Sequence, residues 1–251
     1  MSNHPFSTIF FDLGNTLIYF DGDWTETAIR AQAAIAQSLT RHGFKVDETE
    51  FGLQFNKAIQ QYAQDRRNDL LEPTTSCVLK KTLKEFAIEG ISDEVFAALL
   101  KDYYAVSEER WKLPEDTHPT LEKLRKMGLR MALISNAADA DNVHRQIKSA
   151  DLESYLDLFL ISAEVGIRKP GKEIFQKALD HFQVEPAEVM MVGDLLEADI
   201  QGARNTGITS VWLMRWAHNP ENAACIKWIK PSTKIRRLRE LPRLLEHWKS
   251  K

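Results

Sequence analysis

Five short runs of nearly continuous apolar residues stand out along the 251-residue chain. Because apolar and polar positions do not alternate within them, these runs are typical of parallel strands that helices cover on both faces. We predict buried strands at residues 7–13, 130–136, 156–162, 189–194 and 209–215. Amphipathic stretches predict helices at residues 117–127, 139–149, 172–182 and 197–205. This alternation predicts an α/β fold with a doubly wound, parallel, Rossmann-like sheet.

The segment of residues 19–113 breaks the alternation. It shows no convincing strand pattern, and its apolar positions recur at helical spacing in residues 25–42, 47–69, 75–88 and 92–111. Gly43 and Gly90 follow two of these stretches, where helices commonly stop. We therefore predict an all-helical insert of residues 19–113 within a core made of residues 1–18 and 114–251.

The composition is that of an ordinary globular protein, with 43% hydrophobic and 27% charged residues. The net charge of −3 gives no reason to expect a nucleic-acid partner. Residues 218–251 hold nine lysines and arginines against three glutamates. No nucleic-acid motif accompanies this basic segment, so a solvated helix face is the simpler interpretation.

No apolar run approaches the ~20 residues that a membrane span requires, and the N-terminus lacks the basic start of a signal peptide. Cys77 and Cys225 stand far apart and outside any metal-binding spacing, which favours reduced thiols. We expect a cytoplasmic protein without a membrane or nucleic-acid partner. The sequence makes no prediction of the oligomeric state.

Polar side chains gather where the predicted strands end, at the edge where an open parallel sheet binds its ligands. They are Asp12 after the first strand, Ser135 and Asn136 at the end of the second, Lys169 in the loop after the third, and Asp194 and Asp199 at and after the fourth. Three neighbouring carboxylates repel one another unless a cation lies among them, and oxygen ligands suit Mg²⁺. A strand-end aspartate can also form an aspartyl-phosphate, while lysine, serine and asparagine side chains hold phosphoryl oxygens.

Four motifs made by these residues resemble those of the haloacid dehalogenase-like superfamily of phosphohydrolases. The motifs are Asp12-Leu13-Gly14-Asn15-Thr16 against the family's DxDxT, Ser135 at a strand end, Lys169-Pro170, and Gly193-Asp194 through Asp199 against GDxxxxD. Their order and spacing fit over essentially the whole chain. The insert of residues 19–113 resembles the family's C1-type helical cap.

The resemblance implies an Mg²⁺ site. Asp12, the backbone carbonyl of Gly14, and Asp194 would bind the ion. Asp199 would bind it directly or through water, or would orient Lys169.

The resemblance also implies a phosphate site and a reaction. Asp12 would attack the phosphorus of a small phosphorylated metabolite, and Ser135 would bind a phosphoryl oxygen with help from the amide of Asn136. Gly14 and Asn15 would lie against the substrate, and Lys169 would offset the charge of Asp12 and the phosphate. The cap would close over the site, exclude water and select the leaving group.

One position departs from the family pattern. Phosphatases of the family usually carry a second aspartate two residues after the nucleophile, which acts as general acid and base, and here that residue is Gly14. General acid–base help is typically worth about 10²–10⁴ in rate. Three interpretations follow: substrates with good leaving groups such as acyl or aryl phosphates, a substitute acid from the cap, or phosphate binding without turnover.

Two further interpretations are weighed against phosphate chemistry. The 2-haloacid dehalogenases of the family also lack the second aspartate, but their fourth motif lacks the acidic pair that Asp194 and Asp199 form here. Residues 166–172 approach the GxxxxGK pattern of a P-loop, yet Glu173 stands where serine or threonine would meet Mg²⁺. We therefore favour an Mg²⁺-dependent phosphohydrolase.

Several residues of the insert could line the mouth of the site. They are Asp21, Asp23, Trp24, Arg66, Arg67, Arg110 and Trp111. Surface charge and core packing explain these residue types more simply, so no site role is predicted for them.

Overall fold

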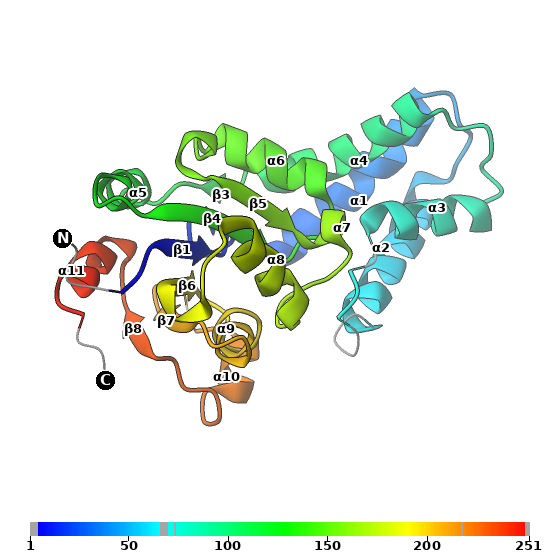
Figure 1. Ribbon diagram of the computed structural model, residues 1–251. Helices are drawn as coiled ribbons and strands as arrows, with labels where there is room; N and C mark the ends of the chain where they lie inside the picture. The colour runs from blue at the N-terminus through cyan, green and yellow to red at the C-terminus, as the bar shows by residue number, and fades with distance from the viewer. Residues whose placement is uncertain (1–4, 66–69, 73, 217, 249–251) are drawn as a thin grey trace.

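Six parallel strands form the central sheet of the computed structural model, which describes residues 5–65, 70–72, 74–216 and 218–248. In spatial order they are β5 (Leu158–Ile161), β4 (Arg130–Ser135), β1 (Thr8–Phe11), β6 (Val189–Gly193), β7 (Thr209–Leu213) and β8 (Thr233–Ile235). The chain runs outward from β1 through β4 to β5 and then restarts beside β1 at β6, as in a Rossmann fold (Figure 1). The predicted doubly wound α/β core is confirmed. The short edge strand β8 is an addition that the apolar pattern did not indicate.

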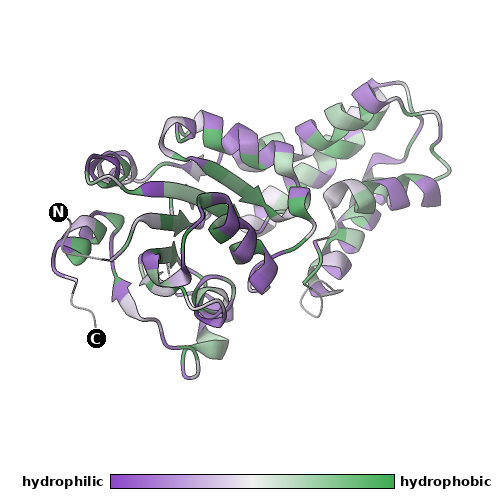
Figure 2. Cartoon of the chain, viewed as in Figure 1, coloured by the Kyte–Doolittle hydropathy of each residue, from purple (hydrophilic) through white to green (hydrophobic). Residues whose placement is uncertain are grey.

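Helices cover both faces of this sheet. Phe11 packs in one cluster with residues of α5 (Thr117–Lys126), α6 (Ala140–Ser149) and α11 (Leu241–Glu246). Its neighbour Phe10 packs in another cluster with α8 (Lys172–Phe182) and α9 (Gly202–Asn205). Adjacent strand residues point to opposite faces, so a strand buried on both sides reads as a continuous apolar run. Figure 2 shows these strands in the green of hydrophobic residues.

Helices α1 (Trp24–Arg41), α2 (Glu48–Asp65), α3 (Thr75–Glu85) and α4 (Asp93–Glu108) make up the insert and extend from one side of the sheet (Figure 1). They share a hydrophobic cluster of their own, with the fully buried side chains Ile35, Leu39, Phe51, Phe55, Leu79 and Leu99. The expected stop appears at Gly43, whose φ angle is 87°, whereas α3 ends at Glu85, before Gly90, and its left-handed residue is Ala87 with φ of 52°. Residues 66–69 of the helix predicted over residues 47–69 lie outside the described residues.

A short antiparallel ribbon lies at the two borders of the insert, where β2 (Tyr19–Phe20) pairs with β3 (Trp111–Lys112). It corrects the expectation that residues 19–113 contain no strand, and the helix predicted up to residue 111 ends at Glu108. Strands of two residues are too short to leave an alternating pattern in the sequence. The ribbon places Trp111 beside the core.

The helix predicted at residues 197–205 is irregular. It begins as a π-helical segment, Leu196–Gln201, and continues as α9. Such segments occur frequently at functional sites, and this one carries Asp199. The amphipathic pattern therefore located the helix and gave no sign of its widened first turns.

The remaining expectations concern the surface and the C-terminal segment. No described helix is both long enough and apolar enough to cross a membrane. Cys77 and Cys225 are free thiols. Within the basic segment, α11 exposes Arg243 and buries Leu241 and Leu245 in the core, as a helix with one solvated face does. The two other short helices of the core are α7 (Ser162–Val165) and α10 (Pro220–Cys225).

Candidate active site

The three aspartates of the predicted site meet at the point where the strand order reverses. Asp12 follows β1 and Asp194 follows the neighbouring strand β6, while Asp199 lies in the π-helical segment. One carboxylate oxygen of each lies within 4.8 Å of the others. In an open α/β sheet, this reversal opens the crevice in which ligands bind.

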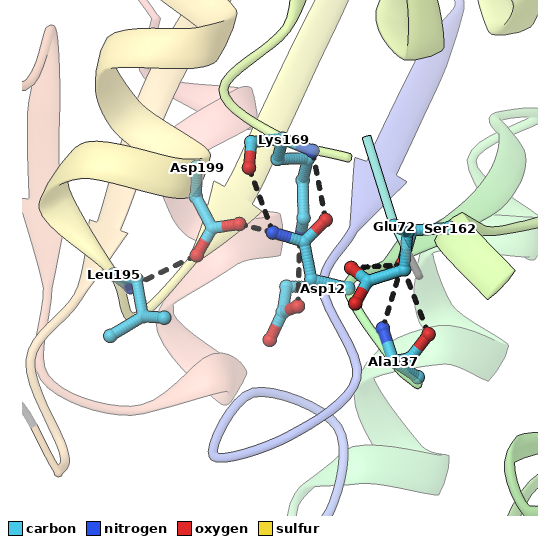
Figure 3. A network of polar contacts seen from close by, with 8 residues as sticks. Asp12, Glu72, Ala137, Ser162, Lys169, Leu195 and Asp199 are labelled. Atoms are coloured by element: carbon cyan, nitrogen blue, oxygen red, sulfur yellow. Dashed lines mark hydrogen bonds and ion pairs between the residues drawn. The ribbon is translucent and has the colours of Figure 1, made fainter. Parts of the chain in front are cut away.

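Lys169 holds two of these carboxylates (Figure 3). Its Nζ donates to Oδ1 of Asp12 at 2.8 Å and to Oδ1 of Asp199 at 2.7 Å. The side chain is almost fully buried, and so is that of Asp199. Asp12 keeps 13% of its side chain exposed and borders a cavity, which makes it the partner that a substrate can reach.

The local backbone explains how Asp199 comes to lie there. A side chain on Gly193 would begin 2.3 Å from the Asp199 carboxyl carbon, so only glycine allows this approach. The backbone N–H of Leu195 donates to the second carboxylate oxygen at 2.9 Å. Asp199 is thus occupied by Lys169 and Leu195 and does not line the cavity. This geometry favours an orienting role toward Lys169 among the three roles that the resemblance left open.

The cluster holds three carboxyl groups, of Asp12, Asp194 and Asp199, and one amino group, of Lys169. Burial raises the pKa of Asp194 to about 9, and the carboxylates of Asp12 and Asp199 add to the effect. Burial also raises the pKa of Asp199 to about 6, against the opposing attraction of Lys169. For Lys169 itself, burial acts to lower the pKa, but Asp12 and Asp199 outweigh it and raise the pKa.

The cluster fits a divalent cation. Oδ2 of Asp194 is buried and has no hydrogen-bond partner among the described residues. A buried oxygen without a partner calls for an explanation such as an ion, and a set of carboxylate oxygens is what Mg²⁺ binds. Asp12 and Asp194 both border the cavity, so an ion between them could also reach a phosphate.

Two buried side chains of the core fix the backbone of Asp194. Its backbone carbonyl accepts hydrogen bonds from Nε1 of Trp212 and Nδ2 of Asn222, each at 2.9 Å. Asn222 also accepts from the backbone N–H of Leu196 at 2.8 Å. Neither supporting side chain belongs to a motif, and no local pattern in the sequence marks them.

Ser135 ends β4 and Asn136 directly follows it, and the two side chains make different contacts. Ser135 borders the cavity with no hydrogen bond from its hydroxyl to another described residue. The side-chain amide of Asn136 is paired with the backbone of Lys169, donating to its carbonyl and accepting from its N–H, both at 2.8 Å. Asn136 therefore positions the Lys169 loop, and its part in substrate binding stays a prediction.

The position of the absent second aspartate is closed by an aromatic ring. A Cβ built on Gly14 would lie 3.2 Å from Cη2 and 3.6 Å from Cζ3 of Trp111. The next residue, Asn15, has a left-handed backbone with φ of 56°, and both loop residues border the cavity. An indole from the insert thus lies where the family pattern would place an acid.

A cavity of about 560 Å³ lies above Asp12 between core and insert. Its polar lining includes residues that the sequence did not indicate, namely Tyr104, Ser107, Asn142, Gln146, Asn219 and Glu221. Of the candidates for the mouth, Trp24 and Trp111 line the cavity, whereas Asp23 caps α1 through the N–H of Glu26 at 2.8 Å. Arg66 and Arg67 lie outside the described residues. Core packing alone therefore does not account for Trp24 and Trp111, because both side chains border the cavity.

The insert is also tied to the core beside the loops that carry Asn136 and Lys169 (Figure 3). The buried carboxylate of Glu72 accepts from Oγ of Ser162 at 2.9 Å and lies 3.3 Å from Nε of Arg168. Ser162 in turn accepts from the N–H of Ala137 at 2.9 Å. Arg168 directly precedes Lys169 and Ala137 directly follows Asn136, so the Glu72 side chain contacts the Lys169 loop directly and is linked to the Asn136 loop through Ser162.

The chain has relatives that support a family assignment. Residues 6–207 match the family described as haloacid dehalogenase-like hydrolase. A glyceraldehyde 3-phosphate phosphatase of Pyrococcus abyssi is 28% identical over 205 residues, which cover 81% of this chain and 79% of that protein. A phosphoserine phosphatase of Thermus thermophilus is 39% identical over 106 residues, or 42% of each chain.

Solved structures share the architecture. A HAD phosphatase from Thermococcus onnurineus has a TM-score of 0.63 at 22% identity, covering 95% of this chain and 97% of its own. A 2-haloacid dehalogenase from Pseudomonas syringae has a TM-score of 0.67 at 21% identity, covering 97% and 100%. At these identities the structures show the fold alone. Since both kinds of enzyme share that fold, the choice between them depends on the residues of the site.

Proposed function

The chain belongs to the haloacid dehalogenase-like hydrolases and is a phosphoric monoester hydrolase, and from that premise we propose an Mg²⁺-dependent reaction through an aspartyl-phosphate on Asp12. The substrate would be a small phosphorylated metabolite with an activated, acyl or aryl, phosphate. The observation that carries the proposal is the pairing of Lys169 with Asp12 beside a buried Asp194 oxygen that has no hydrogen-bond partner in the described part of the chain.

Asp12 is the nucleophile in this mechanism. Lys169 occupies one of its oxygens, Oδ1, and holds the carboxylate in place at the cavity wall. As the Asp12 oxygen bonds to phosphorus, the leaving oxygen departs with its electron pair. Asp199 and the clamp by Asn136 keep the Lys169 ammonium beside the reacting group, where its charge offsets that of the phosphoryl oxygens. The Ser135 hydroxyl is available to donate to one of those oxygens.

The carboxylates of Asp12 and Asp194 and the carbonyl of Gly14 would hold Mg²⁺. When bound, the ion would neutralise charge on the carboxylates and the phosphoryl oxygens. Helices α1–α4 would act as a cap that excludes water, which the closeness of Trp111 to Gly14 supports. We also propose a cytoplasmic location, since the two cysteines are free.

The preference for activated phosphates follows from the lack of an acid beside Asp12, where the leaving group would lie. Gly14 has no side chain to protonate a leaving oxygen, and Trp111 fills the adjoining space with carbon. An acyl or aryl oxygen leaves readily without a proton, whereas an alkyl oxygen does not. Proton transfer by a positioned acid is worth about 10²–10⁴ in rate, so its absence is felt chiefly by alkyl esters.

The test is phosphate release from acetyl phosphate and p-nitrophenyl phosphate, with Mg²⁺ and with EDTA. We expect turnover that needs Mg²⁺ and disappears in Asp12→Asn. Asp180→Asn, on the exposed face of α8, is the matched control and should behave as wild type. If neither substrate is hydrolysed, the preference for activated phosphates is wrong, and the site either binds phosphate without turnover or takes a substrate that these two do not mimic. Halide release from 2-chloropropionate in EDTA would instead establish the dehalogenase alternative.

A further inference from the structure

The outer part of the cavity has an aromatic wall. Trp24 stacks on Phe20 with ring centroids 3.6 Å apart and meets Trp111 edge to face at 5.9 Å. Although Phe20 covers part of it, Trp24 remains 56% exposed, and both tryptophans border the cavity. A partly covered indole held by other rings is a rigid surface on which a flat ligand can stack.

Two amide side chains of α6 border the same cavity. Asn142 and Gln146 lie one helical turn apart and are largely buried. Nε2 of Gln146 donates to Oδ1 of Asn142 at 3.2 Å. The Asn142 amide nitrogen and the Gln146 amide oxygen then have no partner among the described residues and supply one donor and one acceptor. Such a pair suits an uncharged polar substituent.

The charge of the lining disfavours an anionic leaving group. Among the lining residues that the structure describes, Lys169 is the one basic side chain, and Asp12 and Asp199 already hold its ammonium. Glu221 adds a carboxylate to the same lining. A second anion on the substrate would lose water without gaining a cation, which is strongly unfavourable.

We propose that the leaving group is an uncharged aromatic ring bonded directly to the phosphate, so that the substrate class is the aryl phosphates. This substrate class rests on the proposed function, because a phosphate bonded to a ring oxygen has the good leaving group that a site without an acid at Gly14 requires. With the phosphorus at Asp12, the ring lies against Trp111 and Trp24, and a polar substituent reaches the amides of Asn142 and Gln146.

The reaction balances without a further reactant. An Asp12 oxygen bonds to phosphorus as the bond from phosphorus to the ring oxygen breaks. The phenolate departs with the electron pair and takes a proton from water. A second water then hydrolyses the aspartyl-phosphate, which restores the carboxylate and releases phosphate and a proton; that proton neutralises the hydroxide left when the phenolate was protonated.

A matched substrate pair tests the class. We would measure kcat/KM for phenyl phosphate and 4-carboxyphenyl phosphate, with acetyl phosphate as the ring-free reference. The added carboxylate makes the phenolate a better leaving group, yet we expect phenyl phosphate to be favoured at least tenfold. Turnover of 4-carboxyphenyl phosphate at an equal or higher kcat/KM would overturn the proposal, as would a nucleoside 5′-monophosphate that outperforms phenyl phosphate.

Variants of Trp24 test the wall. Trp24→Leu should lower the ratio of phenyl to acetyl phosphate kcat/KM by about three- to tenfold, the size of an aromatic contact, mainly through KM. Trp24→Phe should restore it. Trp228→Leu, 79% exposed and outside the cavity lining, is the control that should keep the wild-type ratio.

The two proposals fail differently. Acetyl phosphate turnover that Asp12→Asn abolishes, with no ring preference and no effect of Trp24→Leu, would overturn the substrate class alone. Absence of turnover on every substrate would overturn the proposed function and this inference with it.

Discussion

Restoring an acid at position 14 is the most informative perturbation of this site. Gly14→Asp supplies the carboxyl that the family pattern has and this chain lacks. A general acid worth 10²–10⁴ in rate corresponds to about 2.7–5.4 kcal/mol of transition-state stabilisation, at about 1.36 kcal/mol per tenfold. In kcat/KM, which reports the steps up to release of the leaving group, the gain should appear with alkyl phosphates, whose leaving oxygen needs a proton, and should be under threefold with acetyl phosphate.

The structure shows why the single substitution falls short of that gain. The new Cβ would lie 3.2 Å from Trp111 Cη2, so the indole must move before a carboxyl group fits. Overpacking of this kind typically destabilises by about 1–3 kcal/mol. Trp111 is in turn held edge to face by Phe20 at 5.5 Å and by Trp24 at 5.9 Å. We therefore expect Gly14→Asp to melt lower than wild type and to gain only about tenfold on glycerol 1-phosphate.

Adding Trp111→Leu should make room for the acid. In the double variant we expect the melting temperature to recover in part and glycerol 1-phosphate turnover to rise toward the full 10²–10⁴ that an acid supplies. Gly14→Ala adds the same Cβ without an acid, and Trp111→Leu alone opens the space without one, so neither should gain. A folded double variant with wild-type turnover of glycerol 1-phosphate would refute the reasoning and would point to a substitute acid already at work.

Three other predictions concern the metal cluster and the insert. Asp194→Asn should weaken Mg²⁺ binding more than Asp199→Asn does. Asp199→Asn should instead lower kcat by about 10–100-fold, because Asp199 orients Lys169. A magnesium titration in which Asp199→Asn weakens binding more would make Asp199 the direct ligand. Since burial holds Asp194 protonated up to a pKa of about 9, Mg²⁺ must displace that proton. Its apparent affinity should therefore rise by up to about tenfold per pH unit below pH 9, and calorimetry in buffers of different ionisation enthalpy should show one proton released. Glu72→Ala should destabilise the protein by about 3–5 kcal/mol because it breaks a buried ion pair with Arg168; urea unfolding should find a comparable loss for Glu72→Gln, which keeps the shape but removes the charge, and a Gln variant as stable as wild type would argue against the ion pair.

Residues that lie far apart in the chain were placed together correctly because strand ends obey a simple rule. Asp12 and Asp194 end neighbouring parallel strands, and the carboxyl ends of such strands share one edge. Continuous apolar runs revealed the strands, since burial on both faces removes alternation. Lys169 follows from the same rule, because the loop after β5 reaches that edge. The structure brings all of these side chains into one cluster.

Other features of the site could not be read from the order of apolar and polar residues in the sequence. The clamp between Asn136 and Lys169 and the support of Asp194 by Asn222 are single contacts between distant loops. Asn142 and Gln146 look like ordinary polar positions of an amphipathic helix. The ribbon of β2 and β3 is too short to show alternation, so the arrival of Trp111 at Gly14 could not be predicted.

The sequence by itself determined the fold class, the order of the chemistry-bearing residues and the absence of an acid at position 14. These depend on local periodicity and on residue identity, which a chain carries without reference to its partners. Only the tertiary structure decided that Asp199 accepts a hydrogen bond from Lys169, that Asp194 holds an oxygen without a partner among the described residues, and that an indole closes the space beside Gly14. Each of these depends on how segments from different parts of the chain pack against one another, and close packing is settled by the whole set of neighbours at once.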